Sequence, residues 1–133
     1  MHHATAILDK HPQATANEAL ARCVQACFVC TLTCTSCADA CLAEEHVHEL
    51  VRCIRLNLDC ADACNATARM LARQTSSEQA LTRSTLETCA QACRICAEEC
   101  ERHADDHEHC RVCAEVCRRC EQACKDLRGS IPA

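Results

Sequence analysis

The cysteines of this 133-residue chain recur at intervals that suit metal binding on helices. Six of the 18 cysteines lie in the stretch CVQACFVCTLTCTSCADAC, residues 23–41, and the others fall in three further segments at intervals of three, four or seven. Side chains three or four residues apart on a helix lie about 5–6 Å apart, so each segment can offer neighbouring thiols to one soft metal ion. Eight pairs have the spacing CxxxC and five have CxxC, a much stronger signal than a single CxxC. The candidate ligands are Cys23, Cys27, Cys30, Cys34, Cys37, Cys41, Cys53, Cys60, Cys64, Cys89, Cys93, Cys96, Cys100, Cys110, Cys113, Cys117, Cys120 and Cys124.

The same intervals indicate four helices. Within each segment the cysteines use only two positions of a seven-residue repeat, which places them along one stripe of a helix. One Gly and two Pro leave little to interrupt the helices. Short connections make neighbouring helices antiparallel, so we predict an all-α fold, an antiparallel up-down-up-down four-helix bundle with a thiol-lined core. The expected helices span residues 16–43, 46–73, 77–103 and 107–128.

Local signals support these boundaries. Residues 15–18 and 75–78 have a Thr followed three positions later by Glu, the pattern of a capping box at a helix start. Gly129 suits a left-handed cap after the last helix. We expect residues 1–12 to form an N-terminal tail or a short extra helix, and residues 13–133 to form the bundle.

Composition and charge exclude several classes of protein. The net charge is −5 with no basic run, and the chain has a single aromatic residue, so we expect no nucleic-acid partner. The N-terminus has no basic region followed by an apolar export segment, and no stretch approaches the ~18 apolar residues of a membrane span. We therefore expect a soluble cytoplasmic protein without a membrane partner, in a compartment that keeps thiols reduced.

Two structural explanations for the thiols compete with metal binding. Cysteine is a small hydrophobe, but filling four helix seams with it gives up the apolar volume that larger side chains bring to a core. Disulfides are the other explanation. Pairs at i and i+4 on one helix do not easily reach disulfide geometry, and a reducing compartment opposes bridges between helices. Metal binding is therefore the favoured reading.

Charge favours many monovalent ions over few divalent ions. Zinc in tetrahedral sites would use four or five ions for 18 thiolates and would leave roughly nine negative charges in the core. Cu(I) accepts two or three sulfurs and a thiolate can bridge two ions, so about one Cu(I) per thiolate brings the core close to neutral. The C-x₂-C-x₂-C-x₃-C-P pattern of iron–sulfur proteins is absent from the sequence. Multiple Cu(I) ions are the predicted cargo, and a zinc or cadmium buffer with four or five tetrahedral sites is the alternative.

The two ends of the predicted bundle differ. Histidines gather where helices 1 and 3 end and helices 2 and 4 begin, and they mark a mouth through which Cu(I) enters. His46 lies near that end in the register of Cys53 and Cys60, and we expect no role for His2, His3, His11 and His48. The histidine ligands predicted there are His103, His107 and His109. The opposite end has seam leucines that form an apolar plug: Leu20, Leu71, Leu86 and Leu127.

Apolar residues also flank the seams of the first two helices. A stripe of this kind indicates either a wider core or an interface between copies of the chain, and we favour the interface. The flanking residues are Val24, Phe28 and Leu32 on the first helix, and Val47, Val51, Ile54 and Leu58 on the second.

Together these features resemble the copper storage proteins. The resemblance lies in the four cysteine-laced helices, with CVQACFVCTLTCTSCADAC in the first and CRICAEEC and CRVCAEVCRRCEQAC in the last two, and it covers about residues 16–128. It implies a cytosolic homotetramer of four-helix bundles that stores many Cu(I) ions and admits them at a histidine-bearing end. A protein that donates or accepts copper is a further implied partner. Asn57 interrupts the cysteine pattern of the second helix.

Other functional classes fit less well. A di-iron bundle needs two Glu-x-x-His motifs, and residues 45–48 are the single match in the sequence. A cysteine nucleophile would be one exposed thiol beside positive charge, unlike 18 inward-facing ones. We therefore predict that the protein is not an enzyme. A thiol redox reservoir is a further class that the pattern does not favour.

Overall fold

The computed structural model describes residues 2–132, and every regular element within that range is helical. The helices are α1 (His2–Asp9), α2 (Glu18–Leu42), the 3₁₀ helix η1 (Val47–Leu50), α3 (Val51–Ala72), α4 (Gln79–His103) and α5 (Glu108–Gly129). Four of them are long, as the cysteine intervals predict. The all-α fold class is confirmed.

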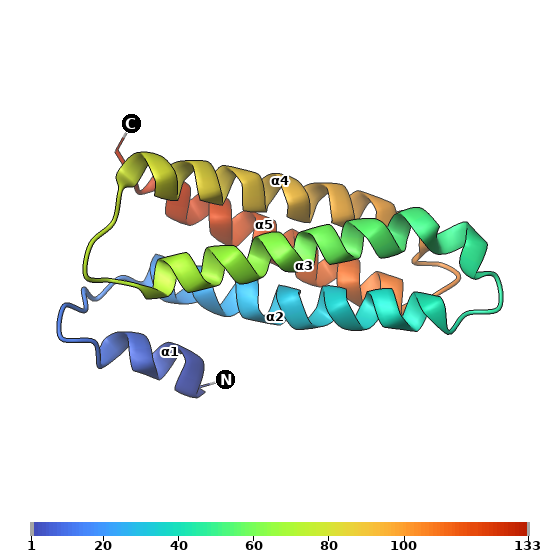
Figure 1. The fold of residues 1–133 in the computed structure, drawn as a ribbon, viewed down its shortest axis with the longest axis horizontal. Helices are drawn as coiled ribbons and strands as arrows, with labels where there is room; N and C mark the ends of the chain where they lie inside the picture. Colours follow the sequence, from blue (N-terminus) through green and yellow to red (C-terminus); the bar gives the residue numbers. More distant parts are fainter. Residues whose placement is uncertain (1, 133) are drawn as a thin grey trace.

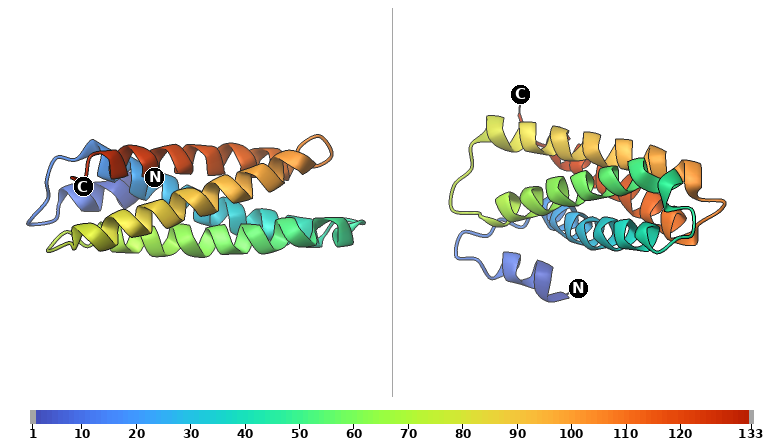
Figure 2. Two further views of the ribbon diagram at one scale, coloured as in Figure 1. Left: turned by 90° about the horizontal axis from the view of Figure 1, so that it is seen from above. Right: turned by 45° about the vertical axis from the view of Figure 1, so that its right-hand side comes forward.

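The four long helices run antiparallel as two hairpins. Helix α2 packs along α3, and α4 packs along α5; the hairpins join through α2 against α5 and α3 against α4. Figures 1 and 2 show that the α2–α3 and α4–α5 connections lie together at one end of the bundle, with the two chain termini at the other. Helix α1 lies beside α2 at the terminal end (Figure 1). The bundle is therefore up-down-up-down, with both histidine-rich connections at one end.

The helix starts differ from the capping predictions. Asn17 begins α2, and its side-chain oxygen accepts a hydrogen bond from the backbone N–H of Leu20 at 3.0 Å, so Thr15 is not the cap. Helix α4 begins after Glu78 with no side-chain cap. Gly129 is the last residue of α5 and has no positive φ, so the predicted left-handed cap is also wrong. A side-chain cap bond contributes only about 1 kcal/mol, so a helix can use a neighbouring cap, as α2 does, or begin without one, as α4 does.

The start of the second long helix also differs from the prediction. Residues 47–50 form a 3₁₀ helix before α3 begins at Val51. A 3₁₀ helix has three residues per turn, so it shifts every side chain before it out of the α-helical register. His46 is consequently exposed, and Leu50 is fully buried at the end of the seam instead.

The core consists mainly of sulfur and methyl groups. Every cysteine side chain is at most 2% exposed. Small alanines flank the cysteines, among them Ala68 and Ala97, which are both fully buried. Small side chains let the helices approach closely, so the sulfur atoms of facing helices come within contact distance.

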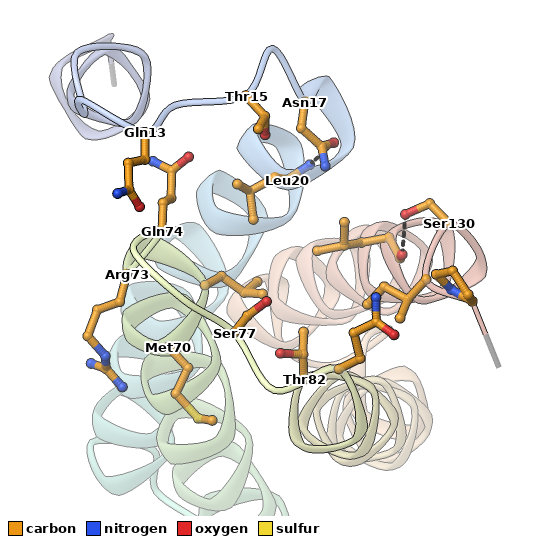
Figure 3. Close-up of a pocket in the computed structure, with 15 residues that line it drawn as sticks. Gln13, Thr15, Asn17, Leu20, Met70, Arg73, Gln74, Ser77, Thr82 and Ser130 are labelled. Carbon is orange, nitrogen blue, oxygen red and sulfur yellow. Dashed lines mark hydrogen bonds between the residues drawn. The ribbon is translucent and has the colours of Figure 1, made fainter.

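Leucines close the terminal end of the bundle. Leu71, Leu86 and Leu127 are buried, and Leu8 of α1 adds a further buried side chain there. Leu20 is only partly buried, and with Leu71 and Leu127 it lines a surface pocket of about 360 Å³ under the α3–α4 connection (Figure 3). Two polar side chains at this pocket bond to backbone carbonyls, Gln74 to that of Leu8 and Ser130 to that of Leu127, and no cysteine lines it. The predicted apolar plug is confirmed for three of its four leucines.

One helix is long and apolar enough to resemble a membrane span. Helix α2 has a mean hydropathy of 1.3 over its most apolar window, so the expectation that no segment approaches a span is wrong on composition. Its cysteines supply much of that hydropathy, and all six are buried against the other helices. A helix in the core of a bundle can have the same length and apolar composition as a membrane span.

The apolar residues beside the seams differ in burial. Val24 is buried in the core, and Val47 and Ile54 are partly buried. Phe28, Leu32, Val51 and Leu58 are exposed by between 45% and 72%, and all four belong to the α2–α3 hairpin.

Candidate metal centre

The thiols form a column of sulfur atoms along the bundle axis. Near the leucine end the Sγ atoms of Cys23 and Cys124 are 3.7 Å apart. In the middle, Cys64 lies 3.6 Å from Cys93, and Cys34 lies 3.6 Å from Cys117. These separations are far longer than the ~2.05 Å of a disulfide, and all 18 thiols are free. The sulfur atoms of the column are therefore in contact with one another as free thiols.

Neighbouring thiols form groups that can each surround a metal ion. Seven such groups in the described part of the chain have ligand atoms within 4.8 Å of one another. Several groups overlap, because at least four buried cysteines belong to more than one of them: Cys30, Cys34, Cys117 and Cys120. A shared sulfur must bridge two ions when both groups are filled. The column thus suits a continuous metal–thiolate array better than separate sites.

Asn57 replaces sulfur at one position of the column. Its side chain is fully buried, and its Oδ1 accepts S–H bonds from Cys96 at 3.1 Å and from Cys113 at 3.2 Å. A longer contact of 3.6 Å joins the same oxygen to Cys100, and Nδ2 donates to the Sγ of Cys53 at 3.7 Å. One amide therefore orients four thiols drawn from three helices. Asn57, which interrupts the cysteine pattern in the sequence, is therefore a buried polar side chain to which these thiols hydrogen-bond.

The histidine end contains a mixed group of sulfur and nitrogen. Cys37, Cys41, Cys110 and His109 have ligand atoms within 4.8 Å of one another. The Nδ1 of His109 lies 3.4 Å from the Sγ of Cys37 and 3.6 Å from that of Cys110. The side chain of His109 is 26% exposed, so this group connects the buried column with solvent.

A carboxylate holds two of the three predicted histidines together. The Oε2 of Glu44 lies 2.8 Å from the Nε2 of His109 and 3.1 Å from the Nδ1 of His107. The two rings are stacked, with centroids 5.5 Å apart. The sequence patterns had not singled out Glu44, because no motif links residue 44 to a turn more than 60 residues away.

The third predicted histidine lies apart from this pair. His103 contacts the Oε2 of Glu99 through its Nε2 at 3.0 Å, and its side chain is 20% exposed. Glu99 also pairs with Arg52 at 3.2 Å and Arg102 at 3.5 Å. His46 pairs edge-to-face with His48 at 6.0 Å, and both are exposed. The structure therefore unites His107 with His109 and places His103 and His46 separately.

The thiols at the histidine end differ in acidity. S–H bonds from Cys100 and Cys110 lower the pKa of Cys37, whereas bonds to Cys37 and Cys53, together with burial, raise the pKa of Cys110. Burial also raises the pKa of Cys41. Burial disfavours the imidazolium of His109, but hydrogen bonds to Cys37 and Glu44 outweigh it and raise its pKa. The pKa is also lowered for Cys53, so thiols with lowered and raised pKa values adjoin one another beside the imidazole.

No buried cation offsets charge in the core. Among residues 3–132, whose side chains are described, the buried charged groups are Glu99 and Glu121, both negative. Each is paired at the surface, Glu121 with Arg118 at 3.1 Å and Lys125 at 2.8 Å. The column can therefore hold thiolates only when protons or metal ions neutralise them.

The fold and the column define a class of protein that holds several soft metal ions within one helical core. The chain belongs to the copper storage protein family, whose pattern it matches over residues 16–129. This match covers all four long helices and every cysteine.

Relatives of known structure share this fold. Ccsp of Streptomyces lividans, loaded with 10 copper equivalents, is 49% identical and superposes with a TM-score of 0.90 over 95% of this chain and 98% of that chain. A structure of copper loading to the cytosolic copper storage protein of S. lividans, with five coppers, is 53% identical with a TM-score of 0.85 over 86% of this chain and 96% of that chain. The uncharacterized cysteine-rich protein YhjQ of Bacillus subtilis (strain 168) is 37% identical over 105 residues, which cover 79% of this chain and 92% of that protein.

Replacement of Asn57 should destabilise the protein without copper. The variant Asn57→Ala leaves three S–H donors without their shared acceptor and opens a small cavity, so we expect a loss of roughly 1–3 kcal/mol in the free energy of unfolding. The measurement is urea denaturation of the reduced protein under anaerobic conditions. Asn65→Ala, at an exposed position of the same helix, is the control and should change stability by less than about 0.5 kcal/mol. Equal stabilities for the two variants would contradict a structural role for the buried amide.

Proposed function

We propose that the protein stores Cu(I) in the cytosol, with about one ion per thiol. The observation that supports this most directly is the buried column in which neighbouring groups share sulfur atoms and no lysine or arginine is buried beside them. The proposed ligands are the 18 cysteines, with imidazole nitrogen at the histidine end. The cytosolic relative from S. lividans supports the compartment.

Copper accounts for the shared sulfurs better than zinc does. A discrete tetrahedral zinc site uses four thiolates and carries a net charge of about −2. Because 18 is not a multiple of four, separate sites of this kind would leave some cysteines without a metal ion, and they would make no use of the sulfurs that neighbouring groups share. One monovalent ion per bridging thiolate keeps each layer of the column near neutral, which matters because charge is costly in a buried core.

Loading exchanges protons for copper. The thiols that keep their protons in the copper-free protein must release them as Cu(I) binds. Cys37 is the natural first thiolate, because neighbouring S–H bonds stabilise its charge and it lies beside His109 near solvent. We infer that ions enter at this end, where His107 and His109 are partly exposed, and then move inward from thiol to thiol. His103 is proposed as a further imidazole at the rim.

Storage rather than catalysis is the proposed role. All cysteines are at most 2% exposed, so none resembles an accessible activated nucleophile. We propose that residues 13–133 are the storage unit and that residues 1–12 are an appended segment. The exposed apolar face of the α2–α3 hairpin supports assembly with other copies of the chain, and the tetramer implied by the family resemblance is the proposed state. A protein that delivers or withdraws copper is a proposed partner.

The test of storage is an anaerobic Cu(I) titration of the fully reduced protein against a competing chromogenic chelator. We expect saturation near one ion per cysteine, roughly 18 per chain, because each thiolate needs one positive charge. Saturation at four or five ions, with zinc competing for the same sites, would contradict the copper proposal and establish the zinc alternative.

Copper affinity should fall as the pH falls. Thiols with raised pKa values, such as Cys41 and Cys110, are protonated at neutral pH, and each lower pH unit makes removal of their protons more costly. We expect the apparent affinity to decrease steadily from pH 8 to about pH 5, measured with the same competing chelator corrected for its own protonation. An affinity that stays constant over this range would contradict the exchange of protons for copper.

Removal of the three histidines should slow loading while leaving capacity nearly intact. The variant His103→Ala/His107→Ala/His109→Ala lacks the proposed imidazole path but keeps all 18 thiols. Stopped-flow mixing with a Cu(I) donor complex measures the rate, and the titration measures the capacity. The matched control is His3→Ala/His11→Ala/His48→Ala, which removes three other histidines. Equal loading rates in the two triple variants would remove the histidine mouth from the mechanism.

A further inference from the structure

We propose that Glu44 is a positioning residue for copper uptake, because one of its carboxylate oxygens orients the imidazoles of both His107 and His109. This inference rests on the proposed function, in which copper enters at the histidine end. Glu44 belongs to the connection between α2 and η1 and has no thiol or imidazole of its own. Its effect would therefore act through the two rings.

The backbone of Glu44 is anchored beside the column. Its N–H donates to the carbonyl oxygen of Cys41 at 3.2 Å, at the end of α2. Cys41 belongs to the same group of ligand atoms as His109. The carboxylate is thus tied to the outermost thiols through one turn of backbone, and it reaches across to the start of α5, where both histidines lie.

The contacts determine which ring nitrogen carries a proton. The hydrogen bond to His109 lowers the pKa of the Glu44 carboxyl below its ordinary range, so the carboxylate is ionised at neutral pH and can only accept hydrogen bonds. The Nε2 of His109 and the Nδ1 of His107 must therefore be the N–H donors to the Oε2 of Glu44. In a neutral imidazole the other ring nitrogen has a free lone pair. In His109 this nitrogen is Nδ1.

That lone pair lies beside the thiols. The Nδ1 of His109 is the atom 3.4 Å from the Sγ of Cys37 and 3.6 Å from the Sγ of Cys110. Without Glu44, the ring of His109 can rotate and exchange its two nitrogens, and its ligand atom loses a fixed direction. A carboxylate bonded to the far nitrogen of a metal-binding histidine is a common means of setting its tautomer and its orientation.

The other carboxylate at this end is in a different situation. Glu99 contacts His103, but Arg52 and Arg102 already share its charge. Among the ion pairs of residues 2–132, Glu44 pairs with His107 and His109 and with no lysine or arginine. Its hydrogen-bonding capacity is thus directed to the two imidazoles, and this singles it out from the acidic residues around it.

The test compares Glu44→Ala and Glu44→Gln with a charge-matched control, Glu45→Ala. Glu45 is the neighbouring exposed residue, and its replacement removes the same charge from the same end. Initial Cu(I) uptake is measured by anaerobic stopped-flow with a chromogenic Cu(I) chelate as donor, and total capacity by titration. Nitrogen-15 NMR of the copper-free protein labelled at histidine reports the tautomers of His107 and His109.

We expect Glu44→Ala to slow initial uptake roughly tenfold, the lower end of effects seen when such a carboxylate is removed. Capacity should be unchanged, and the Nδ1–H signature of His107 should be lost. Glu44→Gln should be intermediate, because its amide oxygen is a weaker acceptor, and Glu45→Ala should behave like the unaltered protein.

Three outcomes would overturn the proposal. The first is an unchanged rate of copper uptake in Glu44→Ala. The second is equal slowing of uptake in Glu45→Ala, which would indicate a general effect of charge. The third is that the histidine tautomers are unchanged in Glu44→Ala. If the unaltered protein itself binds few Cu(I) ions, the proposed function fails instead, so the two failures are distinguishable. The histidine spectrum does not depend on copper and tests the positioning contact in either case.

Discussion

The structure depends on how negative charge is neutralised inside a narrow helical core. Eighteen thiols line the bundle, and no positive side chain is buried among them in the described part of the chain. In the copper-free protein protons neutralise the sulfurs, and stored Cu(I) takes over the same role. Cysteine and alanine are small, so the helices approach closely and the thiols form overlapping groups. In such groups one positive ion can neutralise the charge of neighbouring thiolates.

The two ends of the bundle differ in the side chains that cover the thiols. Leucines pack at the terminal end, where no cysteine lines the surface pocket and the outermost thiols, Cys23 and Cys124, are fully buried. At the other end, partly exposed imidazoles contact the outermost cysteines directly. A long antiparallel bundle provides this polarity simply, because its two sets of connections lie about 30 Å apart by the rise of its helices. Membership of the copper storage protein family agrees with such an arrangement.

A few polar side chains organise the sulfur and nitrogen ligands. Asn57 gathers thiols from three helices around one amide, and Glu44 gathers two imidazoles around one carboxylate. Spacing places Asn57 in the seam between Cys53 and Cys60 but does not show which thiols it contacts, and Glu44 belongs to no spacing pattern. Asn57 drew attention only as an interruption of the cysteine pattern, and Glu44 drew none.

The periodic residues by themselves determined the architecture. Cysteines at three- and four-residue intervals can share one side of a chain only in a helix, so four stripes and short connections led to the bundle, its inward thiols and its leucine-closed end. Local signals were less decisive. The predicted capping boxes at 15–18 and 75–78 are absent: Asn17 caps α2 in place of Thr15, and α4 begins without a side-chain cap.

Only the tertiary structure decided the details of the metal centre. The 3₁₀ turn before α3 moved His46 out of register, and Leu50, seven residues before the seam residue Asn57, is fully buried at the end of the seam. The folded chain alone showed which thiols share groups, which histidines meet, and that Glu44 lies between them. Helical periodicity relates residues that are only a few positions apart in the sequence. The contacts of the metal centre join residues up to about a hundred positions apart, and the packing of the helices sets their distances.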